Sequence, residues 1–105
     1  MLEDDLYAKS NSSIIQDLGM RVRDYRLKAR LTQEELAEKA GVSSLTLKKF
    51  ETGKSTNINM SSFVALLRAL QQLESMNNIL PELPLPPTIL RQYQQNKPKR
   101  IRHGK

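Results

Sequence analysis

The sequence predicts an all-α fold of five helices. Apolar side chains recur at intervals of three and four residues, helix-capping residues precede these runs, and glycines or prolines follow them. With 105 residues, of which 38% are hydrophobic, the chain can bury one compact core and still leave tails. We expect a flexible leader over residues 1–12, a folded domain over residues 13–80, and a Pro-spaced linker with a basic, disordered tail over residues 81–105.

The first helix is expected over Ile14–Arg30. Ser13 and Gln16 can form a capping box, in which the serine caps the helix and the glutamine reaches back to it. Gly19 weakens the N-terminal half of this helix, because glycine disfavours helix interiors. The apolar side chains that recur along the helix are Ile15, Leu18, Val22, Tyr25 and Ala29.

The second and third helices are short and are separated by a glycine. Thr32 caps the second helix, and Glu35 completes a capping box three residues later. Gly41 ends this helix, since glycine readily adopts the left-handed conformation that terminates helices. Ser43 caps the third helix and Gly53 ends it. The inner faces are expected to be Leu36, Ala37 and Ala40 in the second helix, and Leu47 and Phe50 in the third.

The fourth and fifth helices carry more apolar surface than one small core needs. Asn59 or Ser61 starts the fourth helix, and Pro81 stops the fifth. Residues 80–87 should run extended, because their prolines cannot continue a helix. Thr88–Lys105 is polar and basic and is expected to be disordered. The apolar side chains are Phe63, Leu66, Leu67 and Leu70 in the fourth helix, and Met76, Ile79 and Leu80 in the fifth.

The composition excludes several classes of function. The chain has no cysteine, so it has no disulfides, thiol chemistry or cysteine metal sites, and its one histidine is His103. No stretch approaches the ~20 apolar residues of a membrane span. Met1–Asp5 is acidic, unlike a secretory or transit signal, so we expect a cytoplasmic protein. Because nucleophile–base pairs, metal ligands and phosphate loops are missing, we expect no enzyme activity, no catalytic residues, no cofactor and no metal.

The positive charge is concentrated in two regions. The net charge is +6, and residues 91–105 supply six basic side chains and no acidic one, while residues 1–90 are balanced. Within the balanced part, residues 21–56 hold nine basic and five acidic side chains. This distribution is typical of proteins that bind a polyanion, although solubility alone could also account for it.

The most informative segment is Gln33–Thr52. It resembles the helix-turn-helix of the Cro/repressor-like (XRE) proteins. Counting from Gln33, the fifth position is Ala37, small where two helices cross, and the ninth is Gly41, where the sharp turn needs a positive φ. The apolar residues at the packing positions are Leu36, Ala40, Val42, Leu47 and Phe50. The resemblance implies a repressor-like DNA-binding domain. The alternative is two helices with a glycine turn in some other bundle.

The resemblance implies that the third helix inserts into the major groove of double-stranded DNA. Ser44, Leu45 and Lys49 are then expected to read bases, with Lys49 donating to guanine and Leu45 touching a thymine methyl. The other expected DNA contacts are Ser43, Thr46 and Lys48 on the third helix, Gln33 to a phosphate, and Lys54 and Thr56 to the backbone. Two alternatives stay open: Ser43 can serve only as a helix cap, and Lys48 with Lys49 can form only a solvated face.

Relatives of this kind pair an arginine of the first helix with a glutamate late in the third helix. Arg26 and Glu51 stand at the matching positions, so the resemblance implies a partly buried ion pair. We expect this pair to fix the orientation of the third helix rather than to add much net stability. Its role is therefore structural and not catalytic.

The resemblance also implies a homodimer on a palindromic operator with half-sites ~34 Å apart, because one helix-turn-helix contacts only a few base pairs. The surplus apolar surface of the fourth and fifth helices is the natural interface between two copies, although it could equally bind another protein. The residues expected in this dimer interface are Val64, Leu66, Leu73, Met76, Ile79 and Leu80.

Residues 66–105 narrow the resemblance within the family. The parts of this region follow one another in the same order as in HipB-type antitoxins, to which it is similar and which are encoded beside HipA-like kinase toxins. These parts are a Leu-rich helix, a short helix, Leu-Pro-Glu, a Pro-spaced linker and a basic end. It implies a repressor of its own toxin–antitoxin operon with such a kinase as partner. Residues 81–90 and 91–105 would dock on that partner, contact phosphates, or only improve solubility. The alternatives are a regulator without a toxin and a protein-binding adaptor.

Overall fold

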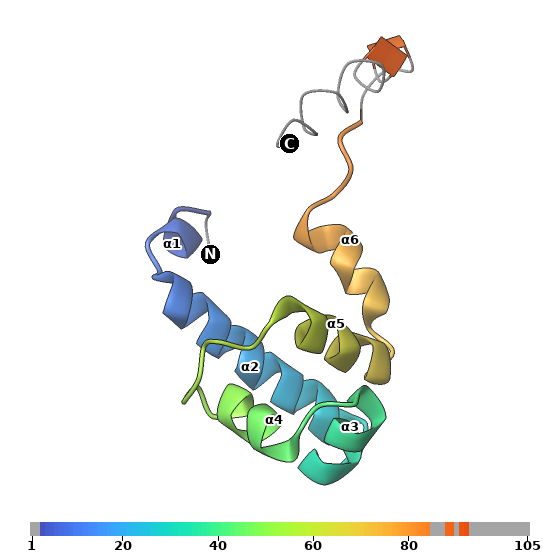
Figure 1. Cartoon of the computed structure of the whole chain (residues 1–105). Coiled ribbons are helices and arrows are strands. Elements are labelled where there is room, and N and C mark those ends of the chain that lie inside the picture. Colours follow the sequence, from blue (N-terminus) through green and yellow to red (C-terminus); the bar gives the residue numbers. More distant parts are fainter. Residues whose placement is uncertain (1–2, 85–87, 90, 93–105) are drawn as a thin grey trace, which may run out of the picture. The chain divides into compact units, whose positions relative to one another are not determined.

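The computed structural model describes residues 3–84, 88–89 and 91–92, and every regular element assigned there is helical. Contacts divide the chain into two compact units, Met1–Ser75 and Met76–Lys105. The predicted all-α fold is confirmed, whereas most of the predicted basic tail lies outside the described residues. The elements are α1 (Glu3–Tyr7), α2 (Asn11–Lys28), α3 (Gln33–Ala40), α4 (Ser44–Glu51), α5 (Met60–Ala69), the 3₁₀ turn η1 (Leu73–Ser75) and α6 (Met76–Ile79) (Figure 1).

The N-terminal region differs from the prediction. Helix α2 begins one turn earlier, because the Ser10 hydroxyl caps it by accepting a hydrogen bond from the main-chain nitrogen of Ser13 at 3.1 Å. Ser13 is therefore inside the helix and is not its cap. Gln16 does not reach back either, since its side chain donates to the Gly53 carbonyl at 3.2 Å. The region predicted to be a flexible leader contains α1 and the start of α2.

The caps of the next helices agree with the prediction. The Thr32 hydroxyl accepts from the Glu35 main-chain nitrogen at 3.0 Å, and the Glu35 carboxylate accepts from the Thr32 nitrogen at 2.8 Å. Gly41 ends α3 in the left-handed conformation, with φ of 72°. Ser43 caps α4. Of the two candidates for the start of α5, Asn59 is the cap, and it accepts from the Ser62 nitrogen at 2.7 Å.

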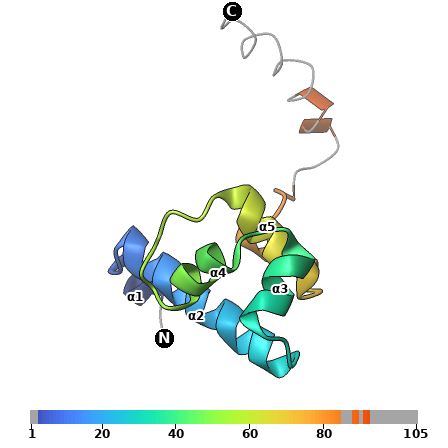
Figure 2. The same ribbon diagram turned by 60° about the horizontal axis from the view of Figure 1, so that its bottom comes forward.

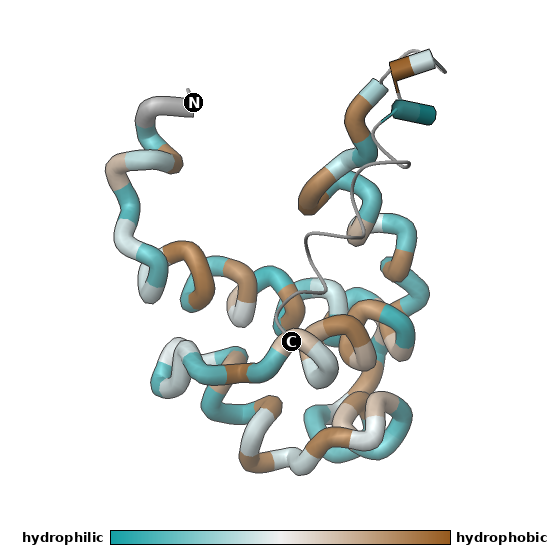
Figure 3. Tube along the Cα trace, turned by 45° about the horizontal axis from the view of Figure 1, so that its top comes forward, coloured by the Kyte–Doolittle hydropathy of each residue, from teal (hydrophilic) through white to brown (hydrophobic). Residues whose placement is uncertain are grey.

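The core lies where α2 to α5 meet. Helix α4 packs against α2 and α3, and α3 also packs against α5 (Figure 2). Apolar and polar positions are interleaved along these helices, as burial of one side requires (Figure 3). Phe50 of α4 and Phe63 of α5 meet edge to face at its centre, with ring centroids 6.2 Å apart. The buried hydrophobic residues are Val22, Leu36, Ala37, Leu47, Phe50, Phe63, Leu66 and Leu67.

The inner face of α2 is rotated relative to the predicted one. Tyr25 is 47% exposed, and Ala29 is the exposed C-cap of the helix, so neither belongs to the core. The buried residues are instead Gly19, Val22 and Arg26, which recur at three- and four-residue intervals. Apolar periodicity alone does not reveal this face, because a glycine and an arginine complete the buried stripe.

Leu66 was wrongly assigned to the dimer interface. Its side chain is 0% exposed, because it lies on the side of α5 that packs into the core. A residue with no accessible surface cannot contribute to a contact with a second copy unless the domain rearranges. Leu66 is therefore a core residue, and the apolar surface left on α5 is smaller than the sequence predicts.

Gly19 allows α2 and α4 to come unusually close. A Cβ atom at this position would lie 2.0 Å from the carbonyl oxygen of Phe50 and 2.8 Å from its carbonyl carbon. Both atoms belong to the backbone, so no side-chain rotation can make room. The glycine that weakens α2 as an isolated helix is therefore required by the packing of the domain.

We predict that Gly19→Ala lowers the free energy of unfolding by about 2 kcal/mol, because α4 must move away from α2 to admit the methyl group. Urea denaturation measures the change. Helix propensity alone predicts the opposite sign, a gain of about 1 kcal/mol. Ser12→Ala, at an exposed position of the same helix, is the matched control. Equal or greater stability of Gly19→Ala would contradict the close contact.

Candidate nucleic-acid interface

The turn between α3 and α4 is short and fixed by hydrogen bonds. The main-chain nitrogen of Gly41 donates to the Glu38 carbonyl at 3.2 Å, and that of Val42 donates to the Ala37 carbonyl at 3.0 Å. These two bonds satisfy carbonyls at the end of α3 that have no partner inside the helix. Because Ser43 then caps α4 directly, the second helix leaves the first at a defined angle with no free linker.

Helix α4 separates its two faces clearly. Leu47 and Phe50 are 0% and 1% exposed and hold the helix on the core. Five residues of α4 are exposed, and Leu45 has 59% of its surface accessible although it is apolar. These exposed residues are Ser44, Leu45, Thr46, Lys48 and Lys49. The structure therefore presents the predicted base-reading residues on one open face, as insertion into a groove requires.

Ser43 and Thr46 are joined by two hydrogen bonds at the start of α4. The Ser43 hydroxyl accepts from the Thr46 main-chain nitrogen at 3.0 Å and donates to the Thr46 hydroxyl at 2.8 Å. Of the two interpretations of Ser43 that the sequence leaves open, this geometry favours the helix cap. Thr46 is exposed and is the better placed of the two for a further polar contact.

A shallow depression of about 130 Å³ lies between the beginnings of α3 and α4. Its lining residues are Gln33, Glu34, Ser44, Leu45 and Lys48, so it brings together four of the predicted site residues. Glu34 is the residue that the sequence-based prediction missed. As an acid in the first turn of α3, Glu34 favours the start of that helix, but this role does not reveal which way its side chain faces.

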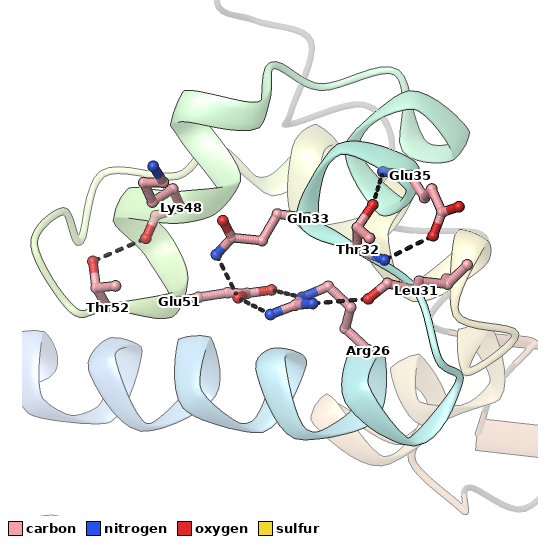
Figure 4. A network of polar contacts seen from close by, with 8 residues as sticks. All are labelled: Arg26, Leu31, Thr32, Gln33, Glu35, Lys48, Glu51 and Thr52. Carbon is pink, nitrogen blue, oxygen red and sulfur yellow. Dashed lines mark hydrogen bonds and ion pairs between the residues drawn. The ribbon is translucent and has the colours of Figure 1, made fainter.

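A buried polar network connects α2, α3 and α4 (Figure 4). Arg26 binds Glu51 through two hydrogen bonds, Nε to Oε2 at 2.8 Å and Nη2 to Oε1 at 3.0 Å. Its remaining nitrogen, Nη1, donates to the Leu31 carbonyl at 2.8 Å. The side chains of the pair are 9% and 0% exposed, so the ion pair expected from the sequence is present and is buried more deeply than expected.

Gln33 joins the same network. Its Nε2 donates to Oε1 of Glu51 at 3.0 Å. Because a carboxylate only accepts hydrogen bonds, the amide nitrogen faces the glutamate and the amide oxygen points away from it (Figure 4). The phosphate contact expected for Gln33 therefore stays a prediction, and it would have to use the second amide hydrogen or the start of α3.

A family model described as a helix-turn-helix domain matches residues 17–75, which is more than half of the chain. The chain belongs to the helix-turn-helix domain family. The match extends from α2 to η1 and so includes the turn at Gly41 and both helices that flank it. No curated protein matches the chain.

The helix-turn-helix domain supports a role as a DNA-binding regulator, since DNA recognition is what this geometry serves in its known uses. Within the residues that the structure describes, no helix is long and apolar enough to cross a membrane. Over the same residues, no group of three or more histidine, cysteine or acidic side chains is arranged to hold a metal ion.

The loop after α4, which carries Lys54, is held beside the helix-turn-helix by hydrogen bonds. The main-chain nitrogens of Lys54 and Ser55 both donate to the Lys49 carbonyl, at 3.0 and 3.2 Å. The Gln16 bond to Gly53 ties the same loop to α2. Lys54 is exposed and Thr56 is half-buried. Both residues predicted to contact the DNA backbone thus follow α4 on an anchored segment.

The remaining residues of the predicted dimer interface have accessible surface. Val64 and Leu73 are half-buried in the first compact unit. In the second unit, Met76 is half-buried, whereas Ile79 and Leu80 are 53% and 85% exposed. Nothing in the arrangement of one copy assigns a partner to these side chains, so the interface stays a prediction.

We predict that Arg26→Met lowers the free energy of unfolding by about 3–5 kcal/mol, because Glu51 would keep a buried charge without its partner. The double variant Arg26→Met, Glu51→Leu should be markedly more stable than Arg26→Met. Urea denaturation measures both variants. Lys9→Met, which breaks the exposed Lys9–Asp17 pair, is the control and should leave stability nearly unchanged. A double variant that is no more stable than Arg26→Met would contradict direct pairing.

Proposed function

We propose that the protein is a sequence-specific transcriptional repressor that binds a palindromic operator as a homodimer and places α4 in the major groove. The observation that carries this proposal is the open face of α4, on which Ser44, Leu45 and Lys49 are exposed while the opposite face is locked into the core. A helix held in this way can enter the groove without unfolding any part of the domain.

The exposed side chains suit different parts of the DNA. Lys49 is long and cationic and would donate to O6 or N7 of guanine, while Leu45 would contact a thymine methyl. Lys54 and Thr56 would bind phosphates on the far side of the groove. Lys48, which lines the depression between α3 and α4, would contact the DNA beside that depression. An adaptor that had lost DNA binding would have no need of three exposed lysines around α4, so this alternative is disfavoured.

We extend the proposal to a HipB-type antitoxin that represses its own operon and binds a HipA-like kinase. The support is the order of parts in residues 66–105, which is similar to such antitoxins. The apolar residues proposed to join the two copies are Val64, Leu73, Met76, Ile79 and Leu80. A regulator without a toxin partner would share the DNA-binding domain and differ in the gene encoded next to it.

The DNA contacts can be tested with duplexes selected from a random pool by the parent protein. We expect Lys49→Ala to reduce discrimination between bases by about 1–3 kcal/mol at the selected position. Lys54→Ala should weaken binding to all sequences alike and reduce the slope of log affinity against log salt by about 1. Lys28→Ala, an exposed lysine at the end of α2, is the control. Parent-like binding by both variants would contradict the placement of α4.

The antitoxin role predicts two further results. A reporter driven by the promoter of the protein's own gene should be repressed by the parent and released by Lys49→Ala, because repression would need base recognition. The product of the neighbouring gene, if it is a kinase, should co-purify with both the parent and this variant, since Lys49 lies outside the proposed partner segment. If the reporter is repressed but no kinase co-purifies, the protein is a repressor without a toxin partner, and the antitoxin role is contradicted.

A further inference from the structure

A second and larger depression lies on the domain, between the end of α3 and the end of α5. Its volume is about 360 Å³, and it is lined by Lys39, Ala40, Ala65, Arg68, Ala69 and Gln71. Three alanines provide a small apolar floor, and two cations stand at its edge with no acidic residue among the lining side chains. The depression therefore fits an apolar side chain with a carboxylate close by.

The rim of this depression is fixed. Gln71 has a left-handed backbone with φ of 60°, and its main-chain nitrogen donates to the Arg68 carbonyl at 3.0 Å. The next nitrogen, of Gln72, donates to the Leu67 carbonyl at 2.8 Å. These two bonds close the end of α5, so the shape of the depression does not depend on a loose loop.

Helix α1 has the matching chemistry. Its sequence is Glu-Asp-Asp-Leu-Tyr, with three acids and no base. Leu6 is 54% exposed and Tyr7 is 86% exposed, so both apolar side chains of this helix are open to a partner. An acidic segment with exposed leucine and tyrosine complements an alanine floor flanked by Lys39 and Arg68 in both polarity and charge.

Within one copy, α1 and this depression lie at opposite ends of α2. Helix α1 precedes the start of α2, where Lys9 and Asp17 form an ion pair of 2.6 Å, while α3 follows its end (Figures 1 and 2). The 18 residues of α2 span about 27 Å. The segment between α1 and α2 is far too short to cover that distance. Helix α1 of the same copy is therefore not the occupant, whereas α1 of a second copy is not limited by this segment.

We propose that α1 of a second copy of this chain docks in the depression between α3 and α5. In a two-fold dimer the contact occurs twice, because each copy offers both the acidic helix and the basic pocket. This proposal rests on the homodimer proposed above and names a contact that holds it together.

The chain contains no tryptophan, so Tyr7→Trp introduces a single fluorescent reporter for this contact. As the protein is concentrated from monomer to dimer, measured in parallel by sedimentation equilibrium, the emission of this indole should move to shorter wavelength. Tyr25→Trp, on the exposed side of α2, is the control and should not shift. A dimer in which the reporter in α1 stays fully exposed would overturn the docking alone. A chain that stays monomeric at every concentration would overturn the homodimer as well.

Charge reversal in the Tyr7→Trp background tests the pairing. Lys39→Glu with Arg68→Glu should weaken dimerisation about tenfold and abolish the emission shift of the reporter, because like charges would face each other. Adding Asp4→Lys and Asp5→Lys should restore both the dimerisation and the emission shift. Lys28→Glu with Arg23→Glu, elsewhere on the exposed surface, is the matched control. An emission shift that does not depend on concentration, or a reversed pair that is not rescued, would overturn the proposal.

Discussion

The contact between α2 and α4 determines where the exposed face of α4 lies. At one point, Gly19 lets the backbone of Phe50 approach so closely that even a methyl group would not fit. At the other, the carboxylate of Glu51 is held by Arg26 through two hydrogen bonds. Because Phe50 and Glu51 are consecutive, these two contacts fix both the depth and the rotation of the last turn of α4.

The two contacts act in different ways. Apolar burial is not directional, so a core of leucines and phenylalanines alone would tolerate some rotation of a short helix. A bidentate ion pair, by contrast, fixes the relative orientation of two planar groups. Its net contribution to stability is small once the cost of burying two charges is subtracted. Its value in this domain is geometric, and Gln33 and the Leu31 carbonyl extend the same constraint to α3 and the segment before it.

The parts of the fold that sequence reasoning predicted are those set by local chemistry. The capping box of Thr32 and Glu35 and the left-handed turn at Gly41 depend on neighbours within a few residues, so a single sequence shows them.

The predicted start of α2 was wrong because Ser10 and Ser13 are both good caps, and the choice between them depends on what the extra turn contacts. Leu66 was misplaced because periodicity gives a helix face but not which neighbour covers it. Gly19 was misjudged and Glu34 was missed for a similar reason, since the approach of α4 and the depression beside Leu45 both depend on how separate helices pack.

The geometry of the α2–α4 contact also matters for the side chains that α4 presents. Ser44 and Leu45 are short, so they can reach base edges only if the helix lies deep in the groove and at a fixed rotation. A long arginine or glutamine could compensate for a displaced helix by changing rotamer, whereas a serine cannot. For base contacts by Ser44 and Leu45, as proposed, the accuracy would have to come from the backbone, whereas the longer Lys49 could adjust its rotamer. The close approach at Gly19 and the buried pair at Arg26 fix the backbone of α4, and they lie away from its exposed surface. Substitutions on that surface would therefore be expected to change the proposed base contacts without loosening the helix.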